Sequence, residues 1–157
     1  MRVREGQNLL MLSADYIVGL TDGEGSFTVY LHPPRKIGKY NTKHYRLECH
    51  YYIKLREDEL PLLEEVKKFF NCGNIYLQKD KRLNHRNCYR FEISSYQKIT
   101  EVVIPFFQNH SLYSVNRRND FDLFCRIFEI LRNKNRRSLT EEELEKIREL
   151  KSQMHRA

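Results

Sequence analysis

The sequence contains no tryptophan, and its few cysteines are not paired at the spacing of a zinc site or a redox motif. The four cysteines, Cys49, Cys72, Cys88 and Cys125, lie 23, 16 and 37 positions apart. Such spacings argue against a structural zinc site and against a disulfide framework, and they are typical of a reducing compartment. We therefore expect an intracellular protein, and an organelle, a nucleoid or the cytoplasm fits equally well.

Long apolar runs are also absent. One of the longest spans residues 102–107, whereas a membrane-spanning helix needs about 20 apolar residues. The first residues include Arg2, Arg4 and Glu5 and hold no apolar stretch followed by a small-residue cleavage site, so we expect no secretory signal. These absences exclude a membrane protein and predict no membrane partner.

Basic residues, in contrast, are plentiful. Lys and Arg number 28 against 21 Asp and Glu, which gives a formal charge of +7. An excess of positive charge fits a polyanionic partner without proving one. The length of 157 residues predicts a single domain with its own core. Within it we expect a loose N-terminal arm over residues 1–12 and a C-terminal helix within residues 138–157.

Two stretches alternate between polar and apolar residues, as strands with one buried face do. The first covers residues 26–31 and the second, which is the clearest pattern in the chain, covers residues 45–55. Two shorter strands are expected at 74–79 and 88–94, around a basic turn. The segment 32–43 contains two prolines and four basic residues, which predicts an exposed hairpin loop.

Helical spacing of apolar residues predicts helices at 57–70, 95–108 and 120–132. A short helix is expected at 15–21, with Ser13 or Asp15 as its N-cap and the acidic, glycine-containing segment 22–25 as its end. Thr140 and Glu143 form a capping box that opens a last helix. The order of elements predicts an α+β fold in which a four-stranded antiparallel sheet is covered by helices on one face.

The sheet face without helices is expected to be polar, basic and rich in aromatic residues. A long antiparallel ribbon of this kind fits the major groove of double-stranded DNA, whereas the plainer interpretation is a solvated sheet face. The pattern alone does not decide between them. The candidate DNA-binding residues of this face and its loop are Ser26, Thr28, Tyr30, His32, Arg35, Lys36, Arg46, Glu48, His50, Tyr52, Lys54, Tyr76, Gln78 and Arg90.

The segment 17–25 combines glycines at helical spacing with acidic residues. Gly19 and Gly23 share one helix face, although each glycine costs a helix roughly 1 kcal/mol. Close approach of another backbone would explain that cost. Asp22 and Glu24 follow, and carboxylate oxygens are ligands that Mg²⁺ prefers. An ordinary acidic turn is the alternative.

Taken as a whole, this segment resembles the motif of the LAGLIDADG homing endonuclease family. It reads I-V-G-L-T-D-G-E-G and is followed by Ser26-Phe27, with Glu24 as the second acid where aspartate is usual. Further similarities are Ile53-Lys54, the segments 71–76 and 104–107, and Asp120-Phe121. The order of elements agrees with the αββαββα arrangement of the family.

The resemblance implies a saddle-shaped fold and, because one motif is present, a homodimer. Tyr16, Gly19, Leu20 and Gly23 would form the interface. The resemblance further implies that Glu24 and the carbonyl of Gly23 bind catalytic Mg²⁺, for which Ca²⁺ would be a non-catalytic substitute. Asp22 resembles a capping and positioning acid.

Basic residues that assist catalysis in this family match the sequence less well. A polar position of the family at the end of the second long strand falls on Leu55, and a frequent basic position just beyond it falls on Glu59, so Lys54 or Arg56 would have to replace them. Arg117 and Arg118 are the other candidates, and the spacing does not choose between them.

The resemblance predicts a Mg²⁺-dependent, site-specific endonuclease for double-stranded DNA. The alternatives are a maturase that acts on intron RNA and a DNA-binding regulator that does not cleave.

Overall fold

The computed structural model describes residues 11–41, 44–132 and 139–156. Most of the expected N-terminal arm therefore lies outside the described residues, as does Lys43 of the predicted hairpin loop. The elements in chain order are α1 (Ala14–Glu24), β1 (Gly25–His32), β2 (Lys36–Ile37), β3 (Tyr40–Asn41), β4 (Arg46–Arg56), η1 (Glu57–Glu59), α2 (Leu60–Phe70), β5 (Asn74–Gln78), β6 (Cys88–Ile93), α3 (Tyr96–Lys98), η2 (Ile99–Val103), α4 (Ile104–Asn109), α5 (Val115–Leu131) and α6 (Glu141–Ser152).

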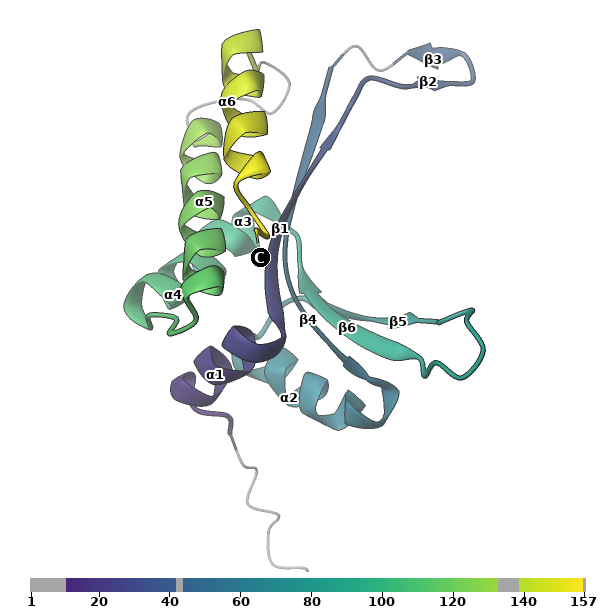
Figure 1. Ribbon diagram of the computed structural model, residues 1–157, viewed down its shortest axis with the longest axis vertical. Helices are drawn as coiled ribbons and strands as arrows, with labels where there is room; N and C mark the ends of the chain where they lie inside the picture. Colours follow the sequence, from purple (N-terminus) through teal and green to yellow (C-terminus); the bar gives the residue numbers. More distant parts are fainter. Residues whose placement is uncertain (1–10, 42–43, 133–138, 157) are drawn as a thin grey trace, which may run out of the picture.

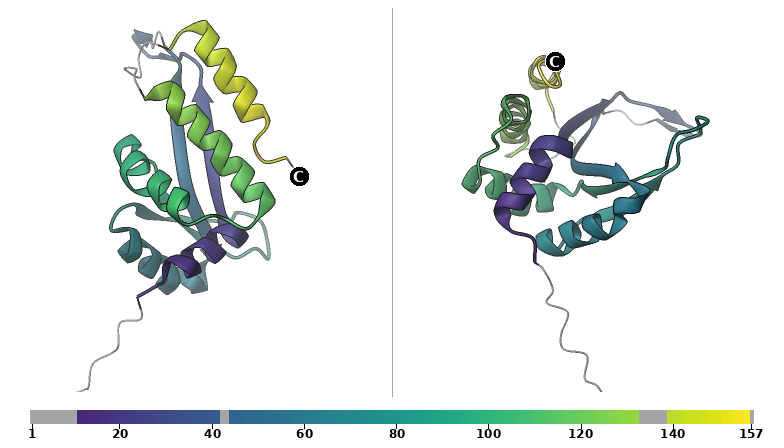
Figure 2. Two further views of the ribbon diagram at one scale, coloured as in Figure 1. Left: turned by 90° about the vertical axis from the view of Figure 1, so that its left-hand side faces the viewer. Right: turned by 60° about the horizontal axis from the view of Figure 1, so that its bottom comes forward.

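Four strands form one antiparallel sheet in the order β1-β4-β6-β5. The helices lie on one side of it, and the strands curve so that the opposite face is concave and uncovered (Figures 1 and 2). In the register, Thr28 lies opposite His50 and Lys54 lies opposite Arg90. The predicted α+β class, with helices on one face, is confirmed. The predicted hairpin loop contains a short ribbon, β2–β3.

The core lies between the convex face of the sheet and the helices. Phe27, Tyr51, Ile53 and Phe91 are fully buried, and all come from alternating positions of β1, β4 and β6. The ring of Phe27 lies 5.3 Å from that of Tyr51 and 5.5 Å from that of Phe124 on α5, centroid to centroid. Period-two alternation therefore places one set of side chains in the core and leaves the other on the open face.

Replacing Ile53 by Ala is expected to destabilise the fold by about 2–5 kcal/mol, because it empties a fully buried site in the central strand. The neighbouring Lys54→Ala changes an exposed residue of the same strand and should cost less than about 0.5 kcal/mol. Urea unfolding of both variants measures the difference. Equal costs would mean that the two faces of β4 are assigned the wrong way round.

Two helix boundaries differ from the sequence prediction. The first helix was expected to end at residue 21, but α1 continues through Asp22 and Gly23 to Glu24. The later helix was expected to begin at residue 120, but α5 begins at Val115. Glycine is common at helix C-termini, whereas in a helix interior it is destabilising because it loses much conformational freedom on folding. Contacts between the two ends, described below, account for both extensions.

The segment predicted as one helix over residues 95–108 is helical from Tyr96, with Ser95 as its N-cap, but it is not uniform. It contains a π-helical stretch, Ile99–Val103, before α4.

The predicted capping box of α6 is present, with Thr140 and Glu143 bonded reciprocally. Beyond α6, the buried carboxylate of Asp120 accepts a bond of 2.9 Å from the backbone N–H of His155, which ties the end of the chain to α5. Among the described residues, none of the helices combines the length and the hydrophobicity that a membrane-spanning segment needs.

Candidate nucleic-acid interface and carboxylate site

The end of α1 is held by a buried hydrogen bond and by a close backbone approach. The hydroxyls of Thr21 and Tyr51 lie 2.8 Å apart, and both residues are fully buried. A Cβ at Gly25 would lie 2.7–2.9 Å from three atoms of Thr21, so only glycine fits where α1 turns into β1. Burial raises the pKa of the Tyr51 hydroxyl despite the Thr21 bond, which keeps it protonated. The position of the next acids is therefore fixed by the core.

Asp22 and Glu24 have different surroundings. The carboxylate of Asp22 accepts hydrogen bonds of 3.0 Å from the backbone N–H groups of both Tyr113 and Ser114. Ser114 is itself the N-cap of α5, so Asp22 joins the end of α1 to the start of α5. Glu24, in contrast, is exposed. One acid is thus engaged in positioning, and the other is free to meet a ligand.

The glycine face of α1 is open. A Cβ added at Gly19 or Gly23 would meet no atom of the chain within 4 Å, and both glycines are exposed. Tyr16 on the same face is 45% exposed, and Leu20 is half-buried. The predicted interface residues therefore form one accessible stripe that leads to Glu24. Nothing inside the described chain explains why these two positions are glycine.

The structure distinguishes the two candidate arginines at the start of α5. Arg118 is exposed, whereas Arg117 is half-buried. The Nε of Arg117 is buried and has no hydrogen-bond partner among the described residues. Arg56, another alternative, pairs with Asp58 at 2.6 Å. A half-buried cation next to the Asp22 contact makes Arg117 the better candidate for contact with an anion.

The donor set at the end of α1 fits Mg²⁺ only in part. In the described ranges no three His, Cys, Asp or Glu side chains gather as a metal site. Glu24 supplies one carboxylate, and Gly23 lies in the last turn, where backbone carbonyls have no helical partner. Mg²⁺ is typically bound by one or two carboxylates together with substrate phosphates and waters. The residues present therefore suit a metal whose other ligands come from DNA, water or a second subunit.

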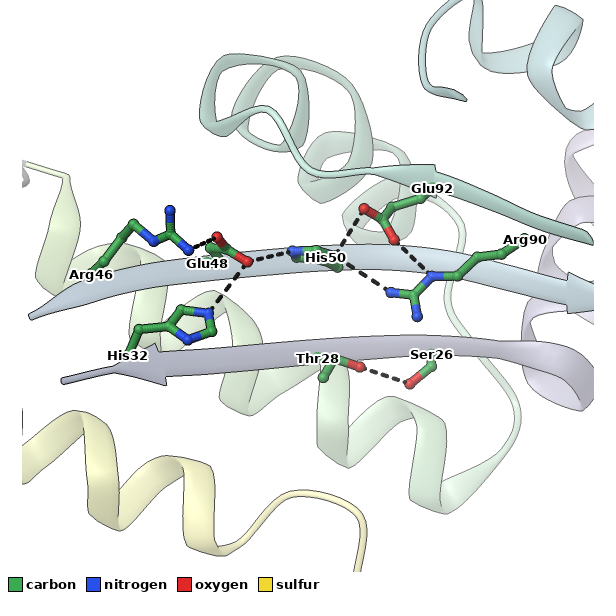
Figure 3. Close-up of polar contacts among 8 residues, drawn as sticks. All are labelled: Ser26, Thr28, His32, Arg46, Glu48, His50, Arg90 and Glu92. Atoms are coloured by element: carbon green, nitrogen blue, oxygen red, sulfur yellow. Dashed lines mark hydrogen bonds and ion pairs between the residues drawn. The ribbon is translucent and has the colours of Figure 1, made fainter. Parts of the chain in front are cut away.

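The open face of the sheet carries a connected polar network (Figure 3). Glu48 pairs with Arg46 at 2.8 Å and lies 3.4 Å from His32 and 3.5 Å from His50. The other ring nitrogen of His50 lies 2.9 Å from Glu92. The predicted DNA-binding residues of β1, β4 and β6 are therefore brought together on one face.

Glu92 was missing from the sequence prediction. It lies beside Arg90 on β6, with 2.6 Å between Arg90 Nε and a Glu92 oxygen, and the register places it opposite Tyr52. The alternation within β6 places it on the same face as Arg90, so this pattern could have identified it. A role for Glu92 is indicated only by its contacts with Arg90 and His50.

The electrostatics of Glu48 follow from this network. Partial burial on its own would raise the pKa of Glu48, but Arg46, His32 and His50 outweigh it and hold that pKa below its usual value. The carboxylate is therefore ionised at neutral pH and offers an acceptor on the open face. Its interactions would be lost only as the pH falls through its lowered pKa.

A shallow hollow of about 340 Å³ lies within this face. It is formed by residues from all four strands of the sheet, including Tyr76 and Gln78 of β5. Its lining is Tyr30, His32, Glu48, His50, Tyr76, Gln78, Arg90 and Glu92. The hollow therefore combines hydrogen-bond donors and acceptors, as recognition of base edges requires, with the faces of two tyrosines.

Some of the basic side chains in the loops at the two ends of the sheet form ion pairs with acidic residues. In the turn between β5 and β6, Arg82 pairs with Asp80 at 2.7 Å, which fixes the turn, and Arg86 lies 3.7 Å from Asp58. In the β2–β3 hairpin, Lys36 and Lys39 are exposed. We therefore expect the β2–β3 hairpin to make more of the contacts to an anion than the turn between β5 and β6, although both are rich in basic residues.

Comparison with known proteins gives consistent results. The LAGLIDADG endonuclease family model matches residues 17–128. A "Probable intron-encoded endonuclease 2" of Neurospora crassa is 28% identical over 123 residues, which are 76% of this chain and 25% of the relative. The chain thus spans about a quarter of that protein.

Solved structures of homing endonucleases are also similar to this chain. I-SmaMI, a LAGLIDADG homing endonuclease bound to cleaved DNA, superposes with a TM-score of 0.76 and 26% identity over 96% of this chain and 46% of its own. The homing endonuclease I-TnaI superposes with a TM-score of 0.73 and 28% identity over 94% of this chain and 91% of its own. With the family model covering most of the chain, this protein belongs to the LAGLIDADG endonuclease family.

Proposed function

We propose that the protein is a Mg²⁺-dependent, sequence-specific endonuclease for double-stranded DNA that acts as a homodimer. The observation that carries this proposal is the placement of Glu24. It is exposed at the end of α1, beside an open stripe that contains Gly19 and Gly23. Two copies that met along this stripe would bring their Glu24 side chains close together.

Each of the chain's own residues at this site would have a separate task in phosphodiester hydrolysis. Glu24 and the Gly23 carbonyl would hold the metal, and Asp22 fixes the end of α1 against the start of α5. Arg117 places positive charge near the scissile phosphate, where charge develops in the transition state. A magnesium ion bound there would act as a Lewis acid and would lower the pKa of a bound water.

The concave sheet face holds the substrate. The strand β4 has 11 residues and spans roughly 35 Å at about 3.3 Å per residue, close to one turn of B-DNA. Two subunits about a two-fold axis would cover roughly 20 base pairs. Exposed residues of this face, such as Arg46 and Lys54, contact base edges or phosphates. The similar protein I-SmaMI was solved bound to cleaved DNA, which supports DNA as the substrate.

Selection of cleavable sites from a randomised DNA library in Mg²⁺ tests the proposal. We expect a site of roughly 20 base pairs whose halves are related by two-fold symmetry. Specific binding without cleavage would favour a DNA-binding regulator, and retention of intron RNA alone would favour a maturase. Either result would overturn the endonuclease assignment.

Binding to the selected site should weaken steeply as the salt concentration rises. Each phosphate contact adds about 0.9 to the negative slope of log K against log salt. Substitution of the exposed Lys36 and Lys39 by Gln should lower the magnitude of that slope by about 1 to 2 per subunit. The paired Arg82, replaced by Gln, should change it less. Fluorescence anisotropy between 50 mM and 200 mM salt measures the slope, and a value near zero would contradict contact through these loops.

A further inference from the structure

We propose that Arg90 is a preformed guanine-reading residue and that Glu92 is the positioning residue that holds it. This inference rests on the proposed DNA-binding function and specifies the chemistry read at the centre of the sheet. Arg90 and Glu92 lie on β6, opposite Lys54 and Tyr52 of β4.

Arg90 is held on two sides. Its Nε lies 2.6 Å from a Glu92 oxygen, and its Cζ lies 3.5 Å from the centre of the Tyr52 ring. The N–H of Nε is not directed at the Glu92 oxygen, so the contact is an ion pair rather than an aligned hydrogen bond. Stacking on Tyr52 is a cation–π contact that also fixes the plane of the guanidinium. A side chain held in this way loses little further entropy when it binds.

Glu92 is held equally firmly. Its side chain is 12% exposed, and its second oxygen lies 2.9 Å from His50 Nδ1. His50 Nδ1 also lies 3.4 Å from Arg90 Nη2. A ring nitrogen that donates to Glu92 does not accept from Arg90, and the shorter distance assigns the proton to the contact with Glu92. The two oxygens of Glu92 are thus committed to His50 and Arg90.

The donors left on Arg90 are those of its two terminal amino groups. Nε is buried, so the 13% of the side chain that is exposed lies elsewhere on it. Arg90 also lines the hollow of about 340 Å³ on the open face. Two terminal amino groups of an arginine match the O6 and N7 acceptors of guanine in the major groove. The hollow therefore presents a fixed two-donor fork to a base edge.

The pair on β4 provides a contrast within the same face. Arg46 also pairs with a carboxylate, Glu48, but its side chain is 70% exposed against 13% for Arg90. Arg46 is therefore free to reorient, whereas Arg90 is restrained. The loss of Glu92 should consequently change what Arg90 recognises, and not merely the overall charge.

Base-preference profiling of binding to the selected site, in Ca²⁺ to prevent cleavage, tests the proposal. Arg90→Ala and Arg90→Lys should each lose preference for guanine at the same one position of both half-sites, by about 5- to 150-fold. Glu92→Gln should flatten the preference at that position at least about fivefold. Tyr52→Phe, which keeps the ring face, should change it less than about twofold, and Tyr52→Leu should weaken it.

Glu64→Gln is the matched charge control, because Glu64 is exposed on α2; it should leave the profile unchanged. Melting temperatures show whether each variant folds. If Glu92→Gln fails to fold, the Arg90 and Tyr52 variants still decide the guanine assignment. An unchanged profile in the Arg90 variants would overturn the proposal. A change at a different position in Glu92→Gln would mean that Glu92 contacts a base itself, which would overturn its assignment as a positioning residue. Failure of the parent protein to select any DNA would instead overturn the proposed function, and this inference with it.

Discussion

Replacement of Glu24 by Gln should reduce DNA cleavage by at least about a hundredfold while specific binding survives. The change keeps the shape of the side chain and removes the negative charge that holds Mg²⁺, so stabilisation of the developing charge on the phosphate is lost. Glu24 is exposed, so its loss leaves the fold intact. Single-turnover cleavage and anisotropy binding on the selected site measure the two effects separately.

Glu142→Gln is the control for this experiment, because Glu142 is an exposed acid on α6. This variant should cleave as the parent protein does. Asp22→Asn should behave differently from Glu24→Gln. It weakens the acceptor for the backbone N–H groups of Tyr113 and Ser114, so it should lower the melting temperature as well as the activity. A Glu24→Gln variant that cleaves within about threefold of the parent would show that the acid at this position is not the metal ligand.

Gly19→Leu should weaken dimer formation by about 5- to 150-fold without unfolding the protein. A large side chain between two closely packed helices costs about 1–3 kcal/mol or more. Within its own chain the new Cβ meets nothing within 4 Å, and leucine favours a helix by up to roughly 1 kcal/mol over glycine. The substitution should thus leave the monomer as stable as before, or more so. Sedimentation across a range of concentrations, with thermal melting, gives both quantities.

Gly25→Ala provides the opposite control. Its Cβ would lie 2.7 Å from the Thr21 side chain and 2.8 Å from its backbone, so this variant should lose stability in the monomer itself. The two glycines therefore separate a requirement of the fold from a requirement of assembly. A Gly19→Leu variant that sediments as a dimer with the parent's dissociation constant would show that the glycine stripe is not the interface.

Much of the fold was predictable because its signals are local. Alternation along β4 identified both the buried Tyr51 and Ile53 and the open-face Arg46 and His50. The capping box at Thr140 was visible as residue types at fixed spacing. Such patterns depend only on near neighbours in the chain, so the strands and their two faces followed from the sequence.

The errors arose where distant segments meet. The end of α1 and the start of α5 are joined by Asp22, which accepts hydrogen bonds from backbone groups 91 and 92 positions away. No local pattern reports such a contact, so both helices were predicted too short. The choice between Arg117 and Arg118 depended on burial, which requires tertiary structure.

The sequence did not show how far the charges of the open face are paired. Arg46 pairs with Glu48 on β4, and Arg90 pairs with Glu92 on β6. Only the structure shows that these side chains meet and that His50 lies between the two acids. The face is therefore better suited to reading base edges through fixed donors and acceptors than to a general attraction of phosphate.

The central claim is that this chain hydrolyses DNA at a specific site with Mg²⁺ held by Glu24. Its most direct test is cleavage of the selected site by the parent protein in Mg²⁺ and in Ca²⁺, beside Glu24→Gln in Mg²⁺. We expect double-strand cleavage within the site in Mg²⁺ only, with tight binding in all three reactions. Specific binding by the parent in Mg²⁺ with no strand cleaved would contradict the claim.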